Sequence, residues 1–290
     1  MRETISVQTM SDGKKVRLAL YQPSQTEGKY VIQLVHGFGE HMGQYQDLIS
    51  KLVNMGYVCV IHDQRGFGEL AAQNKKLQGV TNSYDNWTSD VLEIRKTLIE
   101  KNFPNLPVVL FGHSMGGNIA LNILLKEESA AQLYAKAIIE SPWLRLAEPP
   151  AKIVTGLAKA LGKISARFAV PTGLKMQYVI HDQALVKQVV NDGIFHTRLS
   201  MRLYGQIAEA GEYNLAHADR LLVPTLLLGA QEDHIVSIEA IREFASKASP
   251  KLQYSEIPYG YHLLHADDVW KEFMAEIEHF LNHANRQKDL

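Results

Sequence analysis

Short apolar runs separated by helical patterns recur along this chain, and they constrain its fold more than any other feature. Runs of this length and composition are typical of strands buried on both faces of a parallel sheet. Their alternation with helices predicts an α/β fold, a mostly parallel sheet with helices on both faces. The runs are Tyr30 to Val35, Tyr57 to Ile61, Val108 to Phe111, Ala137 to Ile139 and Thr225 to Leu228.

Helices and an edge hairpin complete this pattern. Val16, Leu18 and Leu20 alternate with other residues after Asp12-Gly13, which predicts an antiparallel hairpin at the front of the chain. Apolar residues at spacings of three and four predict two helices, each with one buried face. They are Trp87, Val91, Ile94 and Leu98 in one helix, and Trp270, Phe273, Ile277 and Phe280 in the other.

One of the predicted strands leads into a glycine-rich turn around a serine. Val108 to Phe111 runs directly into Gly112-His113-Ser114-Met115-Gly116-Gly117, and the helical segment Asn118 to Lys126 follows. So tight a turn requires small residues two before and two after the serine, and Gly112 and Gly116 meet this condition. The turn would hold the hydroxyl of Ser114 out as a nucleophile. The alternative is that these glycines only begin a helix.

A nucleophilic serine needs a histidine to take its proton and a carboxylate to orient that histidine. Asp233 follows the predicted strand Thr225 to Leu228 at the carboxyl edge of the sheet, and it is the expected acid. Its neighbour Glu232 is the local alternative, but we interpret it as a solvated loop charge. Asp219 precedes the strand and therefore lies at the wrong end.

Two histidines lie downstream of that acid, between the strand-like stretch Leu252 to Ile257 and the last helix. His262 comes first, directly after Tyr259-Gly260-Tyr261, and it is the expected base. His265 is expected to be a supporting or surface group. The two could also resemble a metal pair, but no third ligand of suitable spacing accompanies them. We expect neither a metal nor a cofactor.

Acyl transfer also needs hydrogen-bond donors for a negatively charged oxygen. One should be the backbone N–H of Met115, the residue after the predicted nucleophile. The second should come from the loop after Val35, where glycines let the backbone approach the substrate, and Phe38 is the expected donor. His36 and His41 flank this donor, and we expect them to hold the loop in place and not to act in catalysis.

Four stretches of this chain together resemble the monoacylglycerol lipase and lysophospholipase group of serine hydrolases. The resemblance implies the α/β-hydrolase fold and a lipase-type esterase with Ser114, Asp233 and His262 as its triad, which also favours His262 over His265. It implies Phe38 and Met115 as oxyanion donors. The four stretches are His36-Gly37-Phe38-Gly39-Glu40-His41, Asp63-Gln64-Arg65-Gly66-Phe67-Gly68, Gly112 to Gly117, and Gly260-Tyr261-His262 with the upstream Asp233.

The chain departs from that group at one point. The family usually shows Gly-His-Gly-x-Ser after the Asp-x-Arg element, whereas this chain has Gly66-Phe67-Gly68-Glu69-Leu70. The departure leaves the contacts of this loop open, but it does not touch the triad.

Some eighty residues between Ser141 and Thr225 carry few strand signals, which is too long for a simple connection. We expect a helical cap, residues 144–216, inserted into a core of residues 1–143 and 217–290. A lid helix over the pocket is the favoured interpretation, and a basic helix that transiently contacts a membrane surface is the alternative. Its apolar positions are Ile153, Leu157, Leu161 and Ile164, and its lysines are Lys152, Lys159 and Lys163.

Composition limits the partners and the compartment. The 30 basic and 31 acidic residues create no strong field, so no nucleic acid partner is expected. The single cysteine, Cys59, lies in an apolar run and cannot form an internal disulfide, which fits a cytoplasmic protein. Met1 to Met10 shows no signal-peptide pattern, and no apolar run reaches membrane-spanning length.

The predicted partner is a small acyl ester, such as a monoacylglycerol or a lysophospholipid. Because one fold hosts many reactions, cleavage of amides, peptides, thioesters or carbon–carbon bonds remains an alternative. A non-catalytic binding protein is the alternative from another class. An intact triad speaks against it, because a receptor has no need of a base and an acid.

Overall fold

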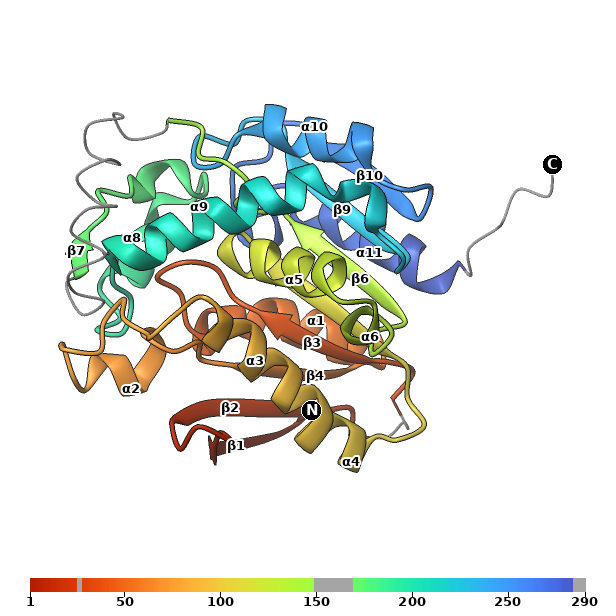
Figure 1. Cartoon of the computed structure of the whole chain (residues 1–290), viewed down its shortest axis with the longest axis horizontal. Helices are drawn as coiled ribbons and strands as arrows, with labels where there is room; N and C mark the ends of the chain where they lie inside the picture. Colours follow the sequence, from red (N-terminus) through yellow and green to blue (C-terminus); the bar gives the residue numbers. More distant parts are fainter. Residues whose placement is uncertain (25–27, 149–168, 284–290) are drawn as a thin grey trace.

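The computed structural model describes residues 1–24, 28–148 and 169–283 (Figure 1). Its central element is an eight-stranded sheet in the order β1-β2-β4-β3-β5-β6-β9-β10. The strands from β4 to β10 in this order run parallel, so the predicted mostly parallel sheet is confirmed. The strands are β1 Arg2–Thr9, β2 Lys15–Gln22, β3 Val31–Val35, β4 Val58–His62, β5 Val108–His113, β6 Lys136–Glu140, β9 Thr225–Ala230 and β10 Leu252–Ile257.

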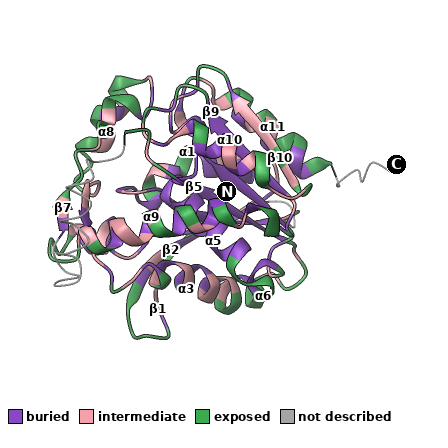
Figure 2. Cartoon of the chain, turned by 45° about the horizontal axis from the view of Figure 1, so that its top comes forward, coloured by how far each residue is buried: buried purple, intermediate pink, exposed green. Residues whose placement is uncertain are grey.

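Helices cover both faces of this sheet, as the sequence predicts. On β5, Val108 and Leu110 belong to one hydrophobic core together with α3, α5 and α10. Val109 and Phe111 point to the other core, with α1 and α11. Figure 2 shows the buried strands between these outer layers. The helices are α1 Gln46–Asn54, α2 Gly68–Ala72, α3 Asp85–Ile94, α4 Glu100–Asn102, α5 Met115–Lys126, α6 Glu128–Ala131, α8 Gln183–Val190, α9 Met201–Ala216, α10 Ile238–Lys247 and α11 Trp270–Asn282.

The front of the chain forms the predicted hairpin. β1 pairs antiparallel with β2, and β2 pairs antiparallel with β4, so this hairpin forms one edge of the sheet. Gly13 adopts a φ of 79° in the turn, a conformation that glycine reaches without steric cost. Cys59 on β4 is fully buried and free, as expected for a small apolar side chain.

The helix predicted from Trp87 to Leu98 differs from a regular α-helix in its last turn. α3 ends at Ile94 and continues as a π-helical turn over Arg95–Ile99. A π turn contains more residues than an α turn, so it shifts the buried position along the chain. Ile99 is therefore fully buried, whereas Leu98 is only partly buried against the core.

The segment between β6 and β9 contains a two-stranded sheet that the sequence did not predict. β7 Ala169–Pro171 pairs antiparallel with β8 Arg198–Ser200. Strands of three residues are too short to show an alternating pattern. The predicted helix carrying Ile153 and Lys159 lies outside the described residues. The division into a core and a cap of residues 144–216 stays a prediction.

α9, at the end of that segment, packs against α5, and Figure 1 shows the two helices side by side. The side-chain amide of Asn214 donates to the carbonyl of Asn118 at 3.0 Å, and that of Asn118 donates to the carbonyl of Ile207 at 3.2 Å. Buried polar side chains of this kind require partners, so these bonds fix how α9 sits on α5.

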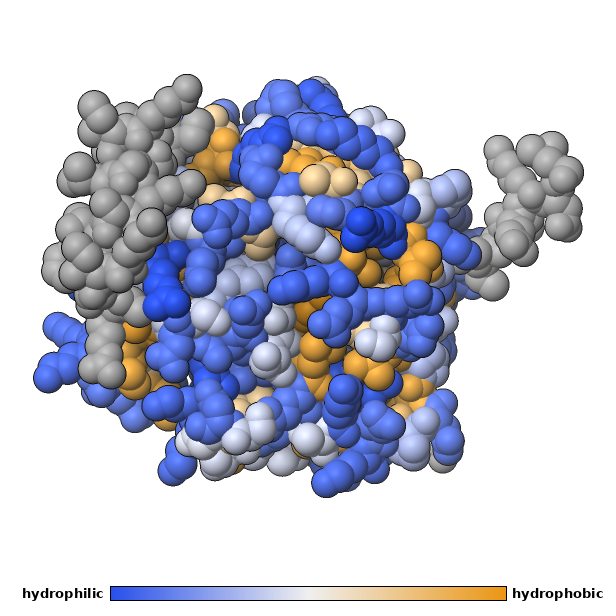
Figure 3. Space-filling model, viewed as in Figure 1, coloured by the Kyte–Doolittle hydropathy of each residue, from blue (hydrophilic) through white to orange (hydrophobic). Residues whose placement is uncertain are grey.

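The face seen in Figure 3 is mostly hydrophilic, with apolar side chains showing in patches between polar ones. Among the described residues, every helix is too short or too polar to cross a bilayer. Contact with a membrane surface and a cytoplasmic location stay predictions.

Candidate active site

The turn between β5 and α5 has the strained geometry that the sequence predicts. Ser114 adopts a φ of 52° and a ψ of −114°, an unusual conformation for a residue with a side chain. A Cβ on Gly112 would lie 2.5 Å from the carbonyl oxygen of Gly116, and one on Gly116 would lie 2.0 Å from that of Val35. Only glycines fit at both positions, so this turn can present the serine at the carboxyl edge of the sheet.

The three predicted triad residues come from three loops and meet in one hydrogen-bonded chain. His262 Nε2 lies 2.9 Å from Ser114 Oγ, and His262 Nδ1 lies 2.7 Å from Asp233 Oδ2. Because a carboxylate only accepts hydrogen bonds, the ring proton belongs on Nδ1, which leaves Nε2 free to accept the serine proton. All three side chains are buried. The alternative acid, Glu232, is exposed on the loop.

The second oxygen of Asp233 holds the acid in place. Its Oδ1 accepts the backbone N–H of Ile235 at 2.8 Å and that of Val236 at 2.9 Å. The pKa of His262 lies above its usual value. Burial opposes protonation of the ring, but the charge of Asp233, followed by those of Glu40 and Glu140, outweighs this effect. The ring is thus a stronger base than a histidine in water.

The sequence predicts the backbone N–H groups of Met115 and Phe38 as oxyanion donors, and Phe38 lines the same cavity as Ser114. Met115 is the first residue of α5, where the N–H has no partner within the helix. Within the described residues, the N–H groups of Met115 and Phe38 donate to no other group. Both are thus available to a ligand, and the partial positive charge of a helix N-terminus adds to the attraction for an anion.

The loop that carries Phe38 is held by buried polar side chains. His36 accepts the backbone N–H of Gln64 on Nε2 at 2.9 Å, and its Nδ1 donates to the carbonyl of Gly37 at 2.8 Å. Glu40 Oε2 accepts the N–H of Gly37 at 2.6 Å. His41 Nε2 pairs with Asp192 at 2.9 Å, across to the segment between β6 and β9. His36 and His41 therefore have the contacts of loop-holding residues.

Phe67, which stands where the family usually has a histidine, has a structural role. Its ring is buried and stacks on His196, with centroids 5.3 Å apart, while Phe38 meets it edge-on at 5.6 Å. Glu69 pairs with Arg17 at 2.8 Å. An aromatic ring at position 67 thus packs the loop of Phe38 against the segment that contains His196.

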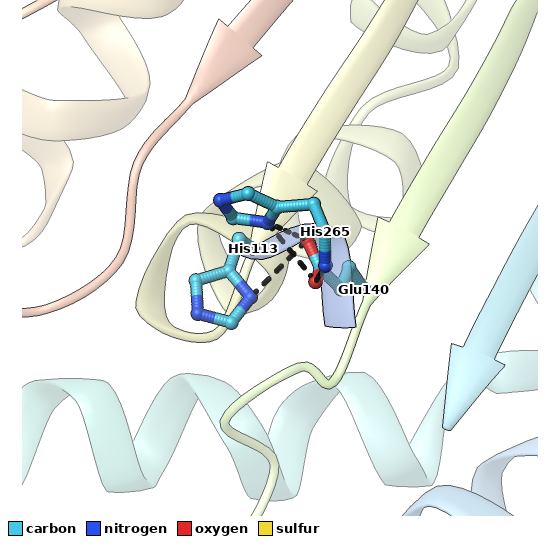
Figure 4. A group of neighbouring side chains, drawn as sticks. All are labelled: His113, Glu140 and His265. Carbon is cyan, nitrogen blue, oxygen red and sulfur yellow. Dashed lines mark hydrogen bonds and ion pairs between the residues drawn. The ribbon is translucent and has the colours of Figure 1, made fainter. Parts of the chain in front are cut away.

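A second group of titratable side chains lies next to the triad, and only one of its members, His265, was singled out from the sequence. His265 is buried, and so are Glu140 at the end of β6 and His113 at the end of β5 (Figure 4). His265 Nδ1 lies 2.8 Å from Glu140 Oε2, and His113 Nδ1 lies 3.4 Å from the same oxygen. His265 was expected to be a supporting or a surface group, and its burial against Glu140 excludes the surface location.

These three side chains are also a possible set of metal ligands. One ligand atom from each lies within 4.8 Å of the others. Two imidazoles and a carboxylate suit zinc, whose usual ligands include both groups. This set could not be recognised from residue spacing, because its members lie far apart along the chain. That the protein binds no metal stays a prediction.

The triad opens into a cavity of about 830 Å³. Its polar lining residues include Glu40, Gln44 and Asp47. Many other lining side chains are apolar and come from the strand and loop ends and from the segment between β6 and β9. These include Trp143, Leu146, Val170, Val179, Ile180, Val186, Leu199, Ile235 and Val236.

Several monoglyceride lipases and a phospholipase are similar to this chain in sequence. The monoglyceride lipase of Mus musculus is 27% identical over 281 residues, covering 94% of this chain and 88% of its own length. The phospholipase YtpA of Bacillus subtilis is 26% identical over 260 residues, covering 87% and 96%. This chain spans only 62% of the length of a Schizosaccharomyces pombe relative and 29% of a Dictyostelium discoideum relative.

Solved structures agree with these relatives. A soluble variant of the monoglyceride lipase from Saccharomyces cerevisiae superposes with a TM-score of 0.85 at 22% identity, covering 96% of this chain and 94% of its own. At this identity the likeness shows the fold alone. The monoacylglycerol lipase of Paleococcus ferrophilus gives a TM-score of 0.77 at 25% identity, covering 93% and 99%.

A model of one protein family covers most of the sequence. The family is described as serine aminopeptidase, S33, and the match runs over residues 26–268. The expected α/β-hydrolase fold and the resemblance to monoacylglycerol lipases are both confirmed by these comparisons. The chain belongs to the serine aminopeptidase S33 family of α/β-hydrolases.

Proposed function

We propose that this protein hydrolyses carboxylic esters, of the monoacylglycerol or lysophospholipid type, with Ser114 as nucleophile. The hydrogen-bonded chain from Ser114 through His262 to Asp233, opening into a largely apolar cavity, is the observation that carries the proposal. Relatives named monoglyceride lipase and phospholipase support the class of substrate.

The proposed reaction has two halves. Ser114 Oγ attacks the ester carbonyl while His262 Nε2 takes its proton, and the negative oxygen accepts hydrogen bonds from the N–H groups of Phe38 and Met115. His262 then gives the proton to the leaving alcohol, and an acyl-enzyme remains on Ser114. Water repeats the same steps, releases the fatty acid and restores the serine.

Each group in this reaction has a role that its surroundings support. Asp233 keeps the proton of His262 on Nδ1 and stabilises the imidazolium that forms. The apolar lining suits an acyl chain, because burying its methylene groups is favourable by about 0.8 kcal/mol each. The polar side chains of Gln44 and Asp47, which also line the cavity, suit the hydroxyl groups of the leaving alcohol.

Peptide or amide cleavage is the second candidate, because the family description names aminopeptidases. It would use the same acyl-enzyme and the same three residues. The large apolar lining favours an acyl chain over a polar peptide.

The test is hydrolysis of p-nitrophenyl esters from acetate to palmitate by wild type and Ser114→Ala, with fluorophosphonate labelling of both. We expect Ser114→Ala to lose turnover by about 10⁴-fold or more and to escape labelling. Ser246→Ala, an exposed serine on α10, is the matched control and should behave as wild type. Full activity of Ser114→Ala would refute the proposal, and labelling of wild type without ester turnover would favour an amide substrate.

A further inference from the structure

Four buried side chains form a line beside the triad, and the proposed reaction does not use them. We call Glu40, His113, Glu140 and His265 the buried quartet. His113 Nε2 lies 3.9 Å from Glu40 Oε1, and its Nδ1 lies 3.4 Å from Glu140 Oε2. His265 Nδ1 completes the line, 2.8 Å from Glu140 Oε2. Figure 4 shows its last three members, which come from β5, β6 and the loop after β10.

Glu140 connects the nucleophile to the loop of the catalytic base. Its backbone carbonyl accepts the N–H of Ser114 at 2.9 Å. Its carboxylate accepts the backbone N–H of His265 at 3.0 Å, in addition to the ring Nδ1. His265 stands three residues after His262. Glu140 therefore forms hydrogen bonds with Ser114 and with the loop of His262, and the side chains of Ser114 and His262 lie 2.9 Å apart.

The other end of the quartet reaches the loop of the oxyanion donor. A Cβ on Gly37 would lie 2.9 Å from the ring of His113, so this ring packs directly against the loop backbone. Glu40 accepts hydrogen bonds from the N–H of Gly37 and from the hydroxyl of Tyr45, both at 2.6 Å. The quartet therefore contacts three of the four loops that the proposed reaction needs, those of Ser114, His262 and Phe38.

The two carboxylates of the quartet also affect the pKa of His262. The groups that face His262 are Asp233, the carboxylates of Glu40 and Glu140, and His113, whose ring centroid lies 4.9 Å from that of His262. The negative charge of Glu140 helps to hold the pKa of His262 above its usual value. Burial opposes ionisation of Glu140, but His265 and His113 outweigh it and keep the pKa of this carboxyl well below its usual value.

We propose that Glu140 is a positioning residue that holds Ser114 and His262 in register, through its backbone carbonyl and its carboxylate. The proposal rests on the function proposed above. Both carboxylate oxygens of Glu140 accept hydrogen bonds from His265. A mispositioned catalytic pair loses rate and not substrate affinity, because the pocket itself is unchanged.

The experiment compares Glu140→Gln with wild type in kcat, KM and the pH profile of kcat, using p-nitrophenyl octanoate. We expect kcat to fall roughly 10- to 100-fold, with KM within about threefold. The reaction requires neutral His262, whereas the negative charge of Glu140 favours the protonated ring. Removing this charge should therefore lower the pKa of His262. The acidic limb of the profile should therefore move to lower pH. Glu272→Gln, the same change at an exposed site on α11, should leave all three unchanged.

Two further variants, His265→Gln and the double variant, separate a loss of positioning from a loss of folding. His265→Gln removes the partner of the Glu140 carboxylate, and it should also lower kcat. The double variant should lose no more than the worse single one, because both changes break the same contact. Thermal unfolding of each variant gives the folded fraction by which rates are corrected.

Several results would overturn the proposal. One is a folded Glu140→Gln with wild-type kcat and KM, and another is a loss of kcat/KM that comes from a raised KM alone. If Glu140→Gln does not fold, a folded His265→Gln with wild-type kcat overturns it instead. Failure of the proposed function has a different signature, namely turnover that survives in Ser114→Ala.

Discussion

The floor and the roof of the cavity present different kinds of side chain to it. The floor, at the carboxyl edge of the sheet, carries Ser114, Asp233 and His262, and each of these makes a defined hydrogen bond to another buried group. The roof, formed by lining residues between Val170 and Leu199, meets the cavity largely through apolar side chains. Hydrogen bonds depend steeply on direction and distance, whereas apolar contacts tolerate a change of shape.

This difference indicates that the floor determines whether the reaction occurs and the roof determines which ester is preferred. A change in the floor should abolish the reaction or the fold, because few geometries satisfy its hydrogen bonds. A change in the roof should alter which ester is preferred, while the reaction continues. Substitutions in the two regions can test this division, since the structure offers a nearby control for each.

The largest effect is expected from Asp233→Asn in the floor. The amide can donate a hydrogen bond to the ring, which favours the wrong tautomer of His262, so kcat should fall by about 10⁴-fold. Steady-state hydrolysis of p-nitrophenyl esters measures this loss. Glu232→Gln is the matched control, because Glu232 is the exposed neighbour on the same loop, and it should keep wild-type kcat. A severe loss in Glu232→Gln and a mild one in Asp233→Asn would mean that the acid is misassigned.

The next effect concerns the turn that supports the floor. In Gly116→Ala the new Cβ would lie 2.0 Å from the carbonyl oxygen of Val35, a backbone atom that cannot easily move. Overpacking of this kind costs about 1–3 kcal/mol of unfolding free energy. Urea unfolding followed by circular dichroism measures the change.

Gly205 on α9 is the control for this substitution. A Cβ there would meet no atom within 4 Å, and alanine is the better helix former, so Gly205→Ala should stabilise the protein by up to about 1 kcal/mol. If Gly116→Ala and Gly205→Ala unfolded at the same urea concentration, the floor would tolerate an added side chain as well as the rest of the fold does, and the contrast would fail.

The floor was predictable from the sequence because its residues lie in patterns with a steric or chemical reason. Ser114 stands between glycines that the turn requires, and Asp233 follows an apolar run at the edge where ligands bind. Glu140 was not predictable. It ends a strand like many other polar residues, and its partners His113 and His265 reach it only through the order of the strands in the sheet.

The roof was less predictable for a different reason. Apolar residues at helical spacing indicate burial, but they do not say whether the buried face meets a core or a cavity. β7 and β8 are too short for their alternation to be recognised, and their pairing joins residues about thirty positions apart. The residues that meet in the hydrogen-bonded chain could therefore be named from the sequence, whereas the acyl-chain length of the substrate could not.

The smallest effect is expected in the roof, from Val186→Trp on α8. Val186 is buried and lines the cavity, so the larger ring should occupy space that a long acyl chain needs. Loss of a few methylene contacts is worth about 1–3 kcal/mol, so kcat/KM for palmitate should fall by roughly tenfold or more relative to that for butyrate. Val190→Trp is the matched control, because Val190 lies four residues on along the same helix and is 47% exposed. Its chain-length profile should equal that of wild type. If Val186→Trp lowered kcat equally for esters of every length, the roof would act on the reaction itself, and the division between floor and roof would fail.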